Sequence, residues 1–301
     1  MDRLNAREDL QEHTPLRGLM ACVPAVLSRD AARSAGPLVT LCDLWSSARS
    51  AIGFSPRYAH SASDYHHMMQ KLAITWLGHS TFLIRTPGGK RLLFDPWLRD
   101  NPSCPEALKK APKADIILVS HGHGDHMDDL VLCARESGAT VVAIYELCDW
   151  LGRKGLQNVA PMNSGGSLQV AGLTITMTDA RHSSGFIDDG KMVYMGEAAG
   201  FVIRLEDQRA IYFAGDTALF GDMQLIGERY KPEIAFLPIG DRITMDPIDA
   251  ARACQMLGVR QVVPMHWGTF PILTGNPDEL KRLVEPRGIQ VLELKPGETA
   301  E

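Results

Sequence analysis

The chain has 301 residues, of which 45% are hydrophobic and 22% are charged, so its composition is that of an ordinary globular protein. A chain of this length buries enough apolar surface to fold without disulfide or metal staples. The formal net charge is −5, so the chain lacks the net positive charge that is typical of proteins that bind nucleic acid. We therefore expect no nucleic-acid partner.

The six cysteines are scattered and form no C-x-x-C pair, which indicates reduced thiols rather than a disulfide framework. No apolar run approaches the roughly 20 residues that a membrane-spanning helix needs. The apolar stretch at 18–27 follows four acidic residues, which do not suit a signal peptide. The sequence predicts a cytoplasmic protein without a membrane span, and it is compatible with a homo-oligomer.

The chain changes character near residue 69. Residues 1–68 show no sustained hydrophobic period, whereas 69–301 are clearly patterned and are expected to form one domain. Two interpretations of the N-terminal extension 1–68 remain open. It is either a small helical appendage on the domain or a weakly ordered stretch upstream of a natural start at Met68 or Met69. The lack of patterned apolar residues favours the second interpretation.

In the first half of the domain, runs of β-branched and aromatic residues predict strands, and helical patterns ending in glycine lie between them. The run ADIILVS at 114–120 is continuously apolar, as expected of a strand buried on both faces. The expected strands are 71–78, 81–86, 91–96, 114–120 and 140–146, and the expected helices are 127–138 and 146–155.

The second half repeats this plan. Each expected helix there begins with Asp246 or Asn276 as an N-cap, followed directly by a proline at the first helical position. Strands grouped in runs with helices between them predict an α/β fold with two sheets packed together and helices outside. The expected strands are 173–180, 199–207, 209–216, 233–239, 261–267 and 289–295, and the expected helices are 246–258 and 276–288.

The stretch SHGHGDHMDD at 120–129 contains the motif H-x-H-x-D-H, formed by His121, His123, Asp125 and His126. Chance would produce this pattern in such a chain only about once in a thousand tries. The motif follows a buried strand, where α/β proteins place their sites. Imidazole and carboxylate ligands suit Zn²⁺ best, with Mn²⁺ or Fe²⁺ as alternatives. The motif therefore predicts a metal site.

Other strand ends supply further candidate ligands. His79 and His182 lie just after expected strands, and His266 lies near the end of another. Asp216 in FAGDT ends an expected strand, where a glycine lets the backbone approach closely. All six histidines beyond residue 68 thus lie at strand ends or within the motif. This placement indicates one shared site.

These motifs in this order resemble the metallo-β-lactamase superfamily. The stretches WLGHSTFLI, DPWL, SHGHGDH, HSSGF, GEAAGFVI, YFAGDTALFGDM, LPIGDRITMDPIDA and MHWGTFP are similar to a branch of uncharacterised metal-dependent hydrolases related to ascorbate-6-phosphate lactonase. The resemblance covers roughly residues 70–301. It implies the four-layer αββα sandwich of that superfamily, with two mixed β-sheets face to face and helices outside.

The resemblance also implies a dinuclear site, with two zinc ions as the expected cofactor. By this carry-over, His121, His123 and His182 hold one metal ion, and Asp125, His126 and His266 hold the other. Asp216 would bridge the two ions, which lie about 3.5–4 Å apart in such sites. A hydroxide between the ions would attack a carbonyl or phosphoryl centre, with Asp125 also able to accept the proton of that water.

Three further residues have more than one interpretation. Asp95 in LLFDPW accepts a hydrogen bond from a ligand imidazole, or is a simple turn acid before Pro96. His79 lies outside the usual ligand set of the superfamily and contacts substrate, buttresses the site or only packs. Arg242 binds an anionic substrate group or forms a solvated ion pair.

The preferred function is hydrolysis of a small ester, lactone or phosphoester by a metal-dependent enzyme, with Asp125, Asp216 and His79 as candidate catalytic residues and a small molecule as the partner. The alternatives are a phosphodiesterase acting on a lipid or nucleic acid and a non-catalytic metal-binding protein. A di-iron redox module is disfavoured, because such relatives have an acid where this chain has His123 and carry an additional flavin domain.

Overall fold

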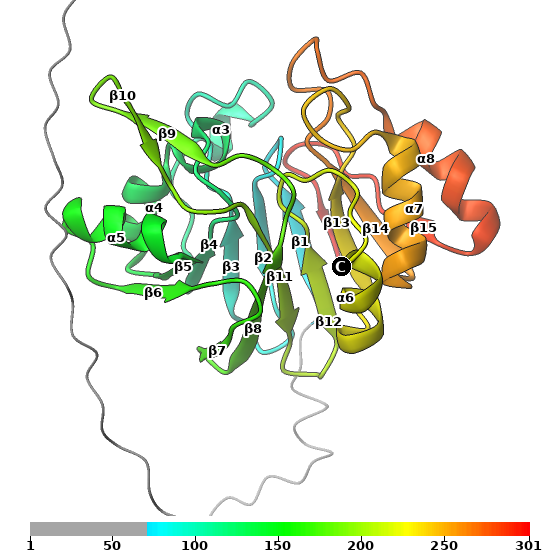
Figure 1. Ribbon diagram of the computed structural model, residues 1–301, viewed down its shortest axis with the longest axis horizontal. Helices are drawn as coiled ribbons and strands as arrows, with labels where there is room; N and C mark the ends of the chain where they lie inside the picture. The colour runs from blue at the N-terminus through cyan, green and yellow to red at the C-terminus, as the bar shows by residue number, and fades with distance from the viewer. Residues whose placement is uncertain (1–70) are drawn as a thin grey trace, which may run out of the picture. The chain divides into compact units, whose positions relative to one another are not determined.

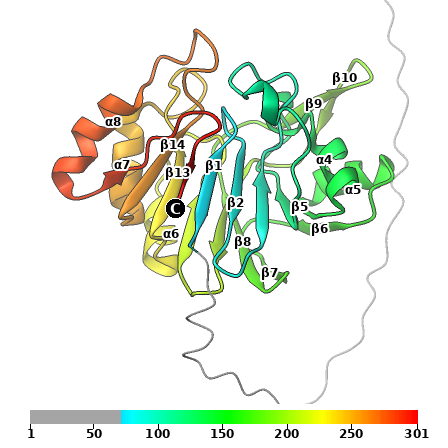
Figure 2. The ribbon, with the colours of Figure 1, turned by 180° about the vertical axis from the view of Figure 1, so that it is seen from behind.

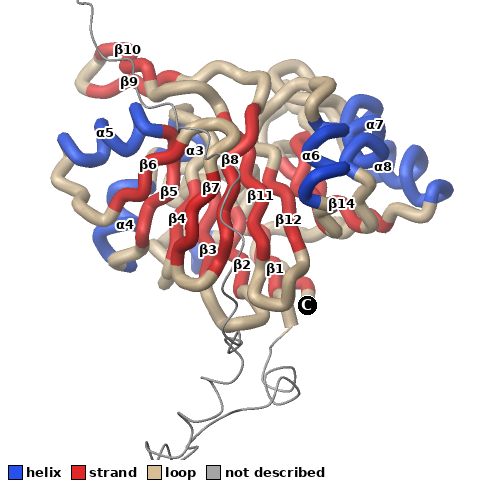
Figure 3. Tube along the Cα trace, turned by 60° about the horizontal axis from the view of Figure 1, so that its bottom comes forward, coloured by secondary structure: helices blue, strands red, loops and turns tan. Residues whose placement is uncertain are grey.

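The computed structural model describes residues 71–301. The expected extension 1–68 lies outside these residues. Within the described part, two seven-stranded mixed sheets lie face to face (Figure 1; Figure 3). A separate two-stranded hairpin rises from one edge of the sandwich.

The first sheet is built almost entirely from the first half of the domain. Its strands β1, β2 and β3 pair antiparallel, and β3, β4, β5 and β6 pair parallel. The edge beside β1 is closed by the C-terminal strand β16, as the view from behind shows (Figure 2). The strands, in spatial order, are β16 (Thr299–Ala300), β1 (Ala73–Trp76), β2 (Phe82–Arg85), β3 (Arg91–Phe94), β4 (Ile116–Leu118), β5 (Thr140–Ile144) and β6 (Val159–Met162).

The second sheet has the same design. Its strands β7, β8, β11 and β12 pair antiparallel, and β12, β13, β14 and β15 pair parallel. In spatial order the strands are β15 (Gln290–Val291), β14 (Gln261–Met265), β13 (Ile234–Pro238), β12 (Ala210–Phe213), β11 (Ala199–Arg204), β8 (Leu173–Asp179) and β7 (Ser167–Val170).

Helices cover both outer faces, which confirms the four-layer αββα arrangement (Figure 1). On the first sheet lie α4 (Leu130–Ser137) and α5 (Tyr145–Arg153). On the second lie α6 (Met223–Tyr230), α7 (Pro247–Leu257) and α8 (Pro277–Val284). The shorter helices are α3 (Gly124–Met127), η2 (Glu106–Leu108) and η3 (Glu285–Arg287).

An aromatic cluster joins the two sheets. Phe94 of β3 stacks on Phe213 of β12 with ring centroids 4.6 Å apart, and Phe82 of β2 meets Phe236 of β13 at 5.0 Å. All four rings are fully buried. Their burial removes a large apolar area from water and holds the sheets in register, so the strand ends that carry the site are fixed relative to one another.

The two expected N-caps are confirmed. Oδ1 of Asp246 accepts from the backbone N–H of Asp249 at 2.7 Å, and Oδ1 of Asn276 accepts from Glu279 at 3.0 Å. The end of the chain differs from expectation. The helix expected over 276–288 ends at Val284, because Pro286 cannot donate a backbone hydrogen bond and the chain continues as a 3₁₀ turn.

Other differences concern short elements. The strand expected over 289–295 pairs only at Gln290–Val291. Sequence patterns did not predict α6, β6, β7 or the hairpin of β9 (Gly185–Asp188) and β10 (Lys191–Tyr194). These strands have four residues each and lie at sheet edges or outside the sheets, where a buried face imposes little alternation.

One edge of the sandwich collects the strand ends that matter for function. The parallel pairings place the carboxyl ends of β3 and β4 together in the first sheet and those of β12, β13 and β14 together in the second. The segments that follow these ends carry the histidine and aspartate motifs.

In residues 71–301, no helix combines the length and apolar character needed to cross a membrane.

Candidate metal centre

The first group of candidate ligands consists of three histidines. His121 and His123 follow β4, and His182 lies three residues beyond the end of β8. One ring nitrogen of each lies within 4.8 Å of the others, a separation that a single ion can span. Nε2 of His121 is 2.9 Å from Nδ1 of His123. The structure therefore brings together the three histidines that the resemblance assigns to one metal ion.

The second group comes from three separate segments. Asp125 and His126 lie in α3, which begins inside the motif, and His266 follows β14. Their ligand atoms, together with one of His79, also lie within 4.8 Å of one another. His126 and His266 are fully buried, whereas the side chain of Asp125 is 26% exposed. Solvent thus reaches this group from the side of Asp125.

Asp216 lies between the two groups. Its Oδ2 is 2.9 Å from Nε2 of His266 and 3.3 Å from Nε2 of His126 in the second group. The same oxygen is 3.7 Å from Nε2 of His182 in the first group. This central position is the one that a bridging carboxylate requires.

The unsatisfied polar atoms of the centre fit a metal ion. Among residues 71–301, Nε2 of His126, both ring nitrogens of His266 and Oδ1 of Asp216 are buried without a hydrogen-bond partner. The nitrogen-to-carboxylate distances given above are short, but their angles are not those of hydrogen bonds. Buried polar atoms left unpaired are costly, so a shared cation is the expected partner of this donor set.

The protonation states also fit. Burial lowers the pKa of His121 well below its ordinary value, which keeps the ring neutral. Burial alone would raise the pKa of Asp216, but His126 and His266 hold it well below its ordinary value. Burial opposes the charge on His126, yet Asp216 and Asp95 raise its pKa well above the ordinary value. The carboxylates around His126 therefore favour a positive charge at this position, which a bound metal ion would supply.

A second layer of hydrogen bonds orients the ligands. Oδ2 of Asp95 lies 2.9 Å from Nδ1 of His126, and its two oxygens accept from the side-chain O–H and backbone N–H of Ser120 at 2.6 and 2.7 Å. Oγ of Ser120 is also 2.9 Å from Nδ1 of His121. Asp95 therefore reaches both ligand groups, one directly and one through Ser120.

His79 is buried inside the second group. Its Nε2 is 3.2 Å from Oδ2 of Asp125, its Nδ1 is 2.9 Å from Oγ1 of Thr269, and its ring centroid is 3.9 Å from that of His266. Burial lowers the pKa of His79 to about 4, with His266 adding to the effect and the hydrogen bond to Asp125 opposing it. A neutral ring at this position can donate to the carboxylate of Asp125.

Two residues of this layer were not singled out from the sequence. Ser120 and Thr269 are polar residues next to ligand motifs, Ser120 directly before His121 and Thr269 three positions after His266. That adjacency is the only signal that could have found them. Asp129, the last residue of the stretch 120–129, is buried and accepts from the backbone N–H groups of Leu98 and Arg99 at 2.6 and 2.9 Å.

Arg242 lies apart from the ligand groups. It is exposed, with a positive φ of 39°, in the loop between β13 and α7. That loop nevertheless borders the centre, because an added Cβ at Gly240 would lie 2.2 Å from the backbone oxygen of His266.

Comparison with known proteins identifies the family of this chain. The family model described as the β-lactamase superfamily domain matches residues 90–267, which is more than half of the chain. A metal-dependent hydrolase of Solibacter usitatus is 50% identical over 226 residues, which cover 75% of this chain and 98% of the relative. Another from Methanopyrus kandleri is 44% identical over 232 residues, covering 76% of this chain and all of the relative.

The fold and site together define a metallo-hydrolase. A solved structure described as a novel metallo hydrolase from the archaeon Ignicoccus hospitalis has 37% sequence identity and a TM-score of 0.68, covering 76% of this chain and 97% of that one. The chain belongs to the metallo-β-lactamase superfamily. Its relatives in that superfamily are named for metal-dependent hydrolysis.

Proposed function

We propose that this protein is a hydrolase that uses two zinc ions to cleave a small ester, lactone or phosphoester. The observation that carries the proposal is the position of Asp216 between a three-histidine group and an Asp–His–His group. In this proposal His121, His123 and His182 hold one ion, and Asp125, His126 and His266 hold the other. Asp216 contributes to both.

The ions, when bound, would lower the pKa of a shared water and polarise the scissile group. The residues of the chain then handle the proton. Asp125 is the ligand carboxylate that solvent reaches, and His79 holds its Oδ2. The water oxygen forms the new bond to carbon or phosphorus, its proton passes to Asp125, and Asp125 returns it to the leaving oxygen as the old bond breaks.

Arg242 supports recognition of an anionic substrate group in this proposal. Its guanidinium is exposed on a loop that borders the centre, and guanidinium groups bind carboxylates and phosphates with two parallel hydrogen bonds. Replacement by lysine would keep the charge and lose this geometry.

The proposal also includes the cellular location, the domain bounds and the self-association of the enzyme. We propose a cytoplasmic location, which agrees with four buried free cysteines among the described residues. We also propose that the hydrolase domain begins near residue 69, after an extension that is not required for metal binding. Self-association of the domain is compatible with this function.

Metal analysis combined with a substrate panel tests the proposal. The full chain should bind about two equivalents of zinc and turn over at least one member of a panel of aryl esters, lactones, aryl phosphodiesters and β-lactams. Asp216→Ala should abolish turnover, and the exposed carboxylate of Asp222 provides the matched control Asp222→Ala. Binding of a single equivalent that survives His266→Ala would refute the dinuclear site.

A further inference from the structure

Exposed apolar side chains gather beside the metal centre. In residues 71–301, eight large hydrophobic side chains are exposed, and five of them lie on three segments that adjoin the ligand groups. These five are Ile187, Met192 and Tyr194 on the β9–β10 hairpin and Ile243 and Ile272 on the loops after β13 and β14. Contiguous exposed apolar surface next to a site indicates a binding function, whereas single exposed residues do not.

The hairpin has one anchored face and one free face. On the anchored face, Phe186 packs against Trp150 of α5 at 5.5 Å, and Asp188 accepts hydrogen bonds from Trp150 and Lys154 at 2.8 Å each. A two-stranded ribbon is only marginally stable by itself, so these contacts fix its orientation. Because one face of the hairpin contacts α5, the opposite face is exposed to solvent.

The free face is apolar. Ile187 and Met192 are direct cross-strand partners, and Tyr194 lies two residues from Met192 on the same side of the ribbon. Their side chains are 64%, 71% and 59% exposed. Exposing three apolar side chains in one contiguous row to water is unfavourable in free energy, and binding of an apolar partner would remove this surface from water.

The base of the hairpin is joined to the first ligand group. The backbone N–H of Gly122, between His121 and His123, donates to Oγ of Ser184 at 3.1 Å. Oγ of Ser183 is 3.3 Å from Nε2 of His123. Ser184 directly precedes β9, and Ile187, the first apolar residue of the free face, follows it by three positions.

Ile243 and Ile272 are joined to the second ligand group. The loop that carries Ile243 packs on His266 through Gly240, and it receives a hydrogen bond from Thr274 to Asp241 at 3.2 Å. Ile272 lies six residues after His266 on the partner loop. Figure 1 shows the hairpin and these two loops rising on opposite sides of the same edge of the sandwich.

We propose that the free face of the hairpin and these two loops bind the hydrocarbon part of the substrate, so that the enzyme acts on amphiphilic molecules with a hydrolysable head and an alkyl or aryl body. This inference rests on the proposed function, since the head must reach the metal centre. The hairpin is attached to the first ligand group through Ser183 and Ser184, and the loop of Ile243 is attached to the second through Gly240. A substrate with an apolar body is the occupant that matches both features.

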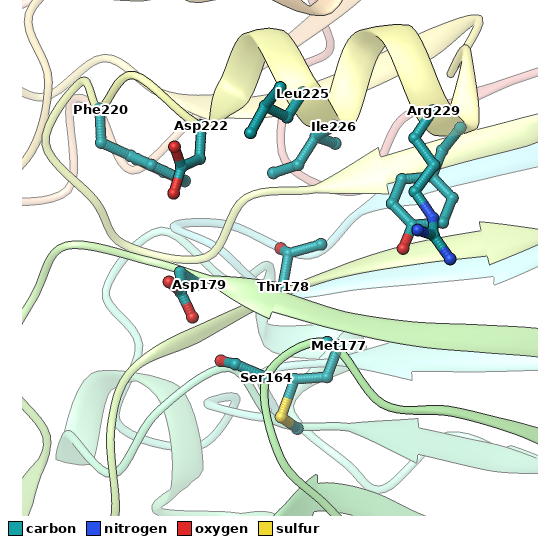
Figure 4. Close-up of a pocket in the computed structure, with 11 residues that line it drawn as sticks. Ser164, Met177, Thr178, Asp179, Phe220, Asp222, Leu225, Ile226 and Arg229 are labelled. Carbon is teal, nitrogen blue, oxygen red and sulfur yellow. The ribbon is translucent and has the colours of Figure 1, made fainter.

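One exposed apolar residue provides a matched control. Leu225 on α6 is 60% exposed but lines a separate cavity of about 350 Å³ on the outer face of the second sheet, with Thr178 and Phe220 (Figure 4). The residues that line this cavity include none of the seven candidate ligands. Replacing it by serine removes a comparable exposed side chain away from the proposed binding surface.

The test measures binding, not only turnover. Methyl-, butyl-, hexyl- and octylphosphonate are titrated by calorimetry into the zinc-loaded full chain. Affinity should rise roughly two- to fourfold per methylene, since full burial of one methylene corresponds to about fourfold. The double variants Ile187→Ser/Met192→Ser and Ile243→Ser/Ile272→Ser should flatten this rise while methylphosphonate binding stays unchanged. Leu225→Ser should behave as the unmodified protein does.

The outcomes separate this inference from the proposed function. A chain-length dependence without turnover of any ester or phosphoester would support the apolar surface and reject hydrolysis. Turnover with phosphonate affinity independent of chain length would reject the apolar surface alone. Phosphonate affinity could be independent of chain length while sedimentation shows that Ile187→Ser/Met192→Ser dissociates an oligomer. This result would assign the surface to a second copy of the chain and overturn the inference.

Discussion

Oδ2 of Asp95 lies 2.9 Å from Nδ1 of His126, and both side chains are wholly buried. Because this contact occupies Nδ1, the other ring nitrogen is directed at Asp216. Asp95 itself adopts a positive φ of 44°, an unusual backbone conformation for a residue other than glycine. The chain tolerates that conformation where it places a carboxylate behind a candidate metal ligand.

We expect Asp95→Asn to weaken zinc binding by about 10- to 100-fold, because partners of this kind set the tautomer and basicity of a ligand imidazole. Competition with a chromophoric chelator measures the affinity. Asp100→Asn, at an exposed position on the following loop, should leave the affinity unchanged. Equal affinities for both variants would show that Asp95 is only a turn residue.

Zinc should stabilise the folded chain. A ligand at 100 times its dissociation constant adds about 2.7 kcal/mol to the free energy of unfolding. For a domain of this size that corresponds to a rise in Tm of roughly 5–10 °C. Differential scanning calorimetry with and without a chelator measures the shift. His266→Ala should reduce it, and a Tm that does not depend on zinc would contradict the metal centre.

Thr269→Val should lower kcat/KM by about tenfold while leaving zinc affinity nearly unchanged, since Thr269 supports His79 rather than a ligand atom directly. Valine keeps the shape of threonine and removes the oxygen that is 2.9 Å from Nδ1 of His79. Stopped-flow assays on the best panel substrate provide the measurement. Thr140→Val, at the start of β5, is the control, and a similar loss in both variants would argue against a role for His79.

Gly215→Ala should disrupt the centre, whereas Gly138→Ala should cost only about 1 kcal/mol of stability. Both glycines have a positive φ, of 62° and 68°. An added Cβ at Gly215 would lie 2.6 Å from Cβ of Ser120 and 2.8 Å from the backbone oxygen of Ala199, but at Gly138 it would meet open space. Urea denaturation and zinc stoichiometry of the two variants test this contrast directly.

Phe94→Ala should destabilise the domain by about 3–5 kcal/mol, because the ring is fully buried between the sheets and its loss leaves a cavity. Leu225→Ala, at an exposed position, should change stability by less than about 0.5 kcal/mol. Equilibrium unfolding in urea measures both. A small effect at Phe94 would mean that the aromatic cluster does not join the two sheets.

Sequence patterns predicted the longer elements well because those elements repeat their apolar residues with a clear period. The strand expected over 173–180 is observed at Leu173–Asp179, and the helix expected over 246–258 is observed at Pro247–Leu257. The hairpin of β9 and β10 escaped prediction. Its apolar residues face solvent on one side, which is the reverse of the pattern that identifies a strand packed on a core.

The sequence by itself determined which side chains are candidate ligands, because H-x-H-x-D-H is a rare pattern and every other histidine beyond residue 68 lies at the end of an expected strand. Only the tertiary structure decided how they are grouped. His182 is 59 positions from His123, and Asp216 is 90 positions from His126, so their closeness depends on sheet pairing and the aromatic contact between sheets. Packing between distant segments also places His79 against Asp125 and Ser120 against Asp95. It likewise places the apolar hairpin beside the centre. Local sequence patterns do not encode such packing.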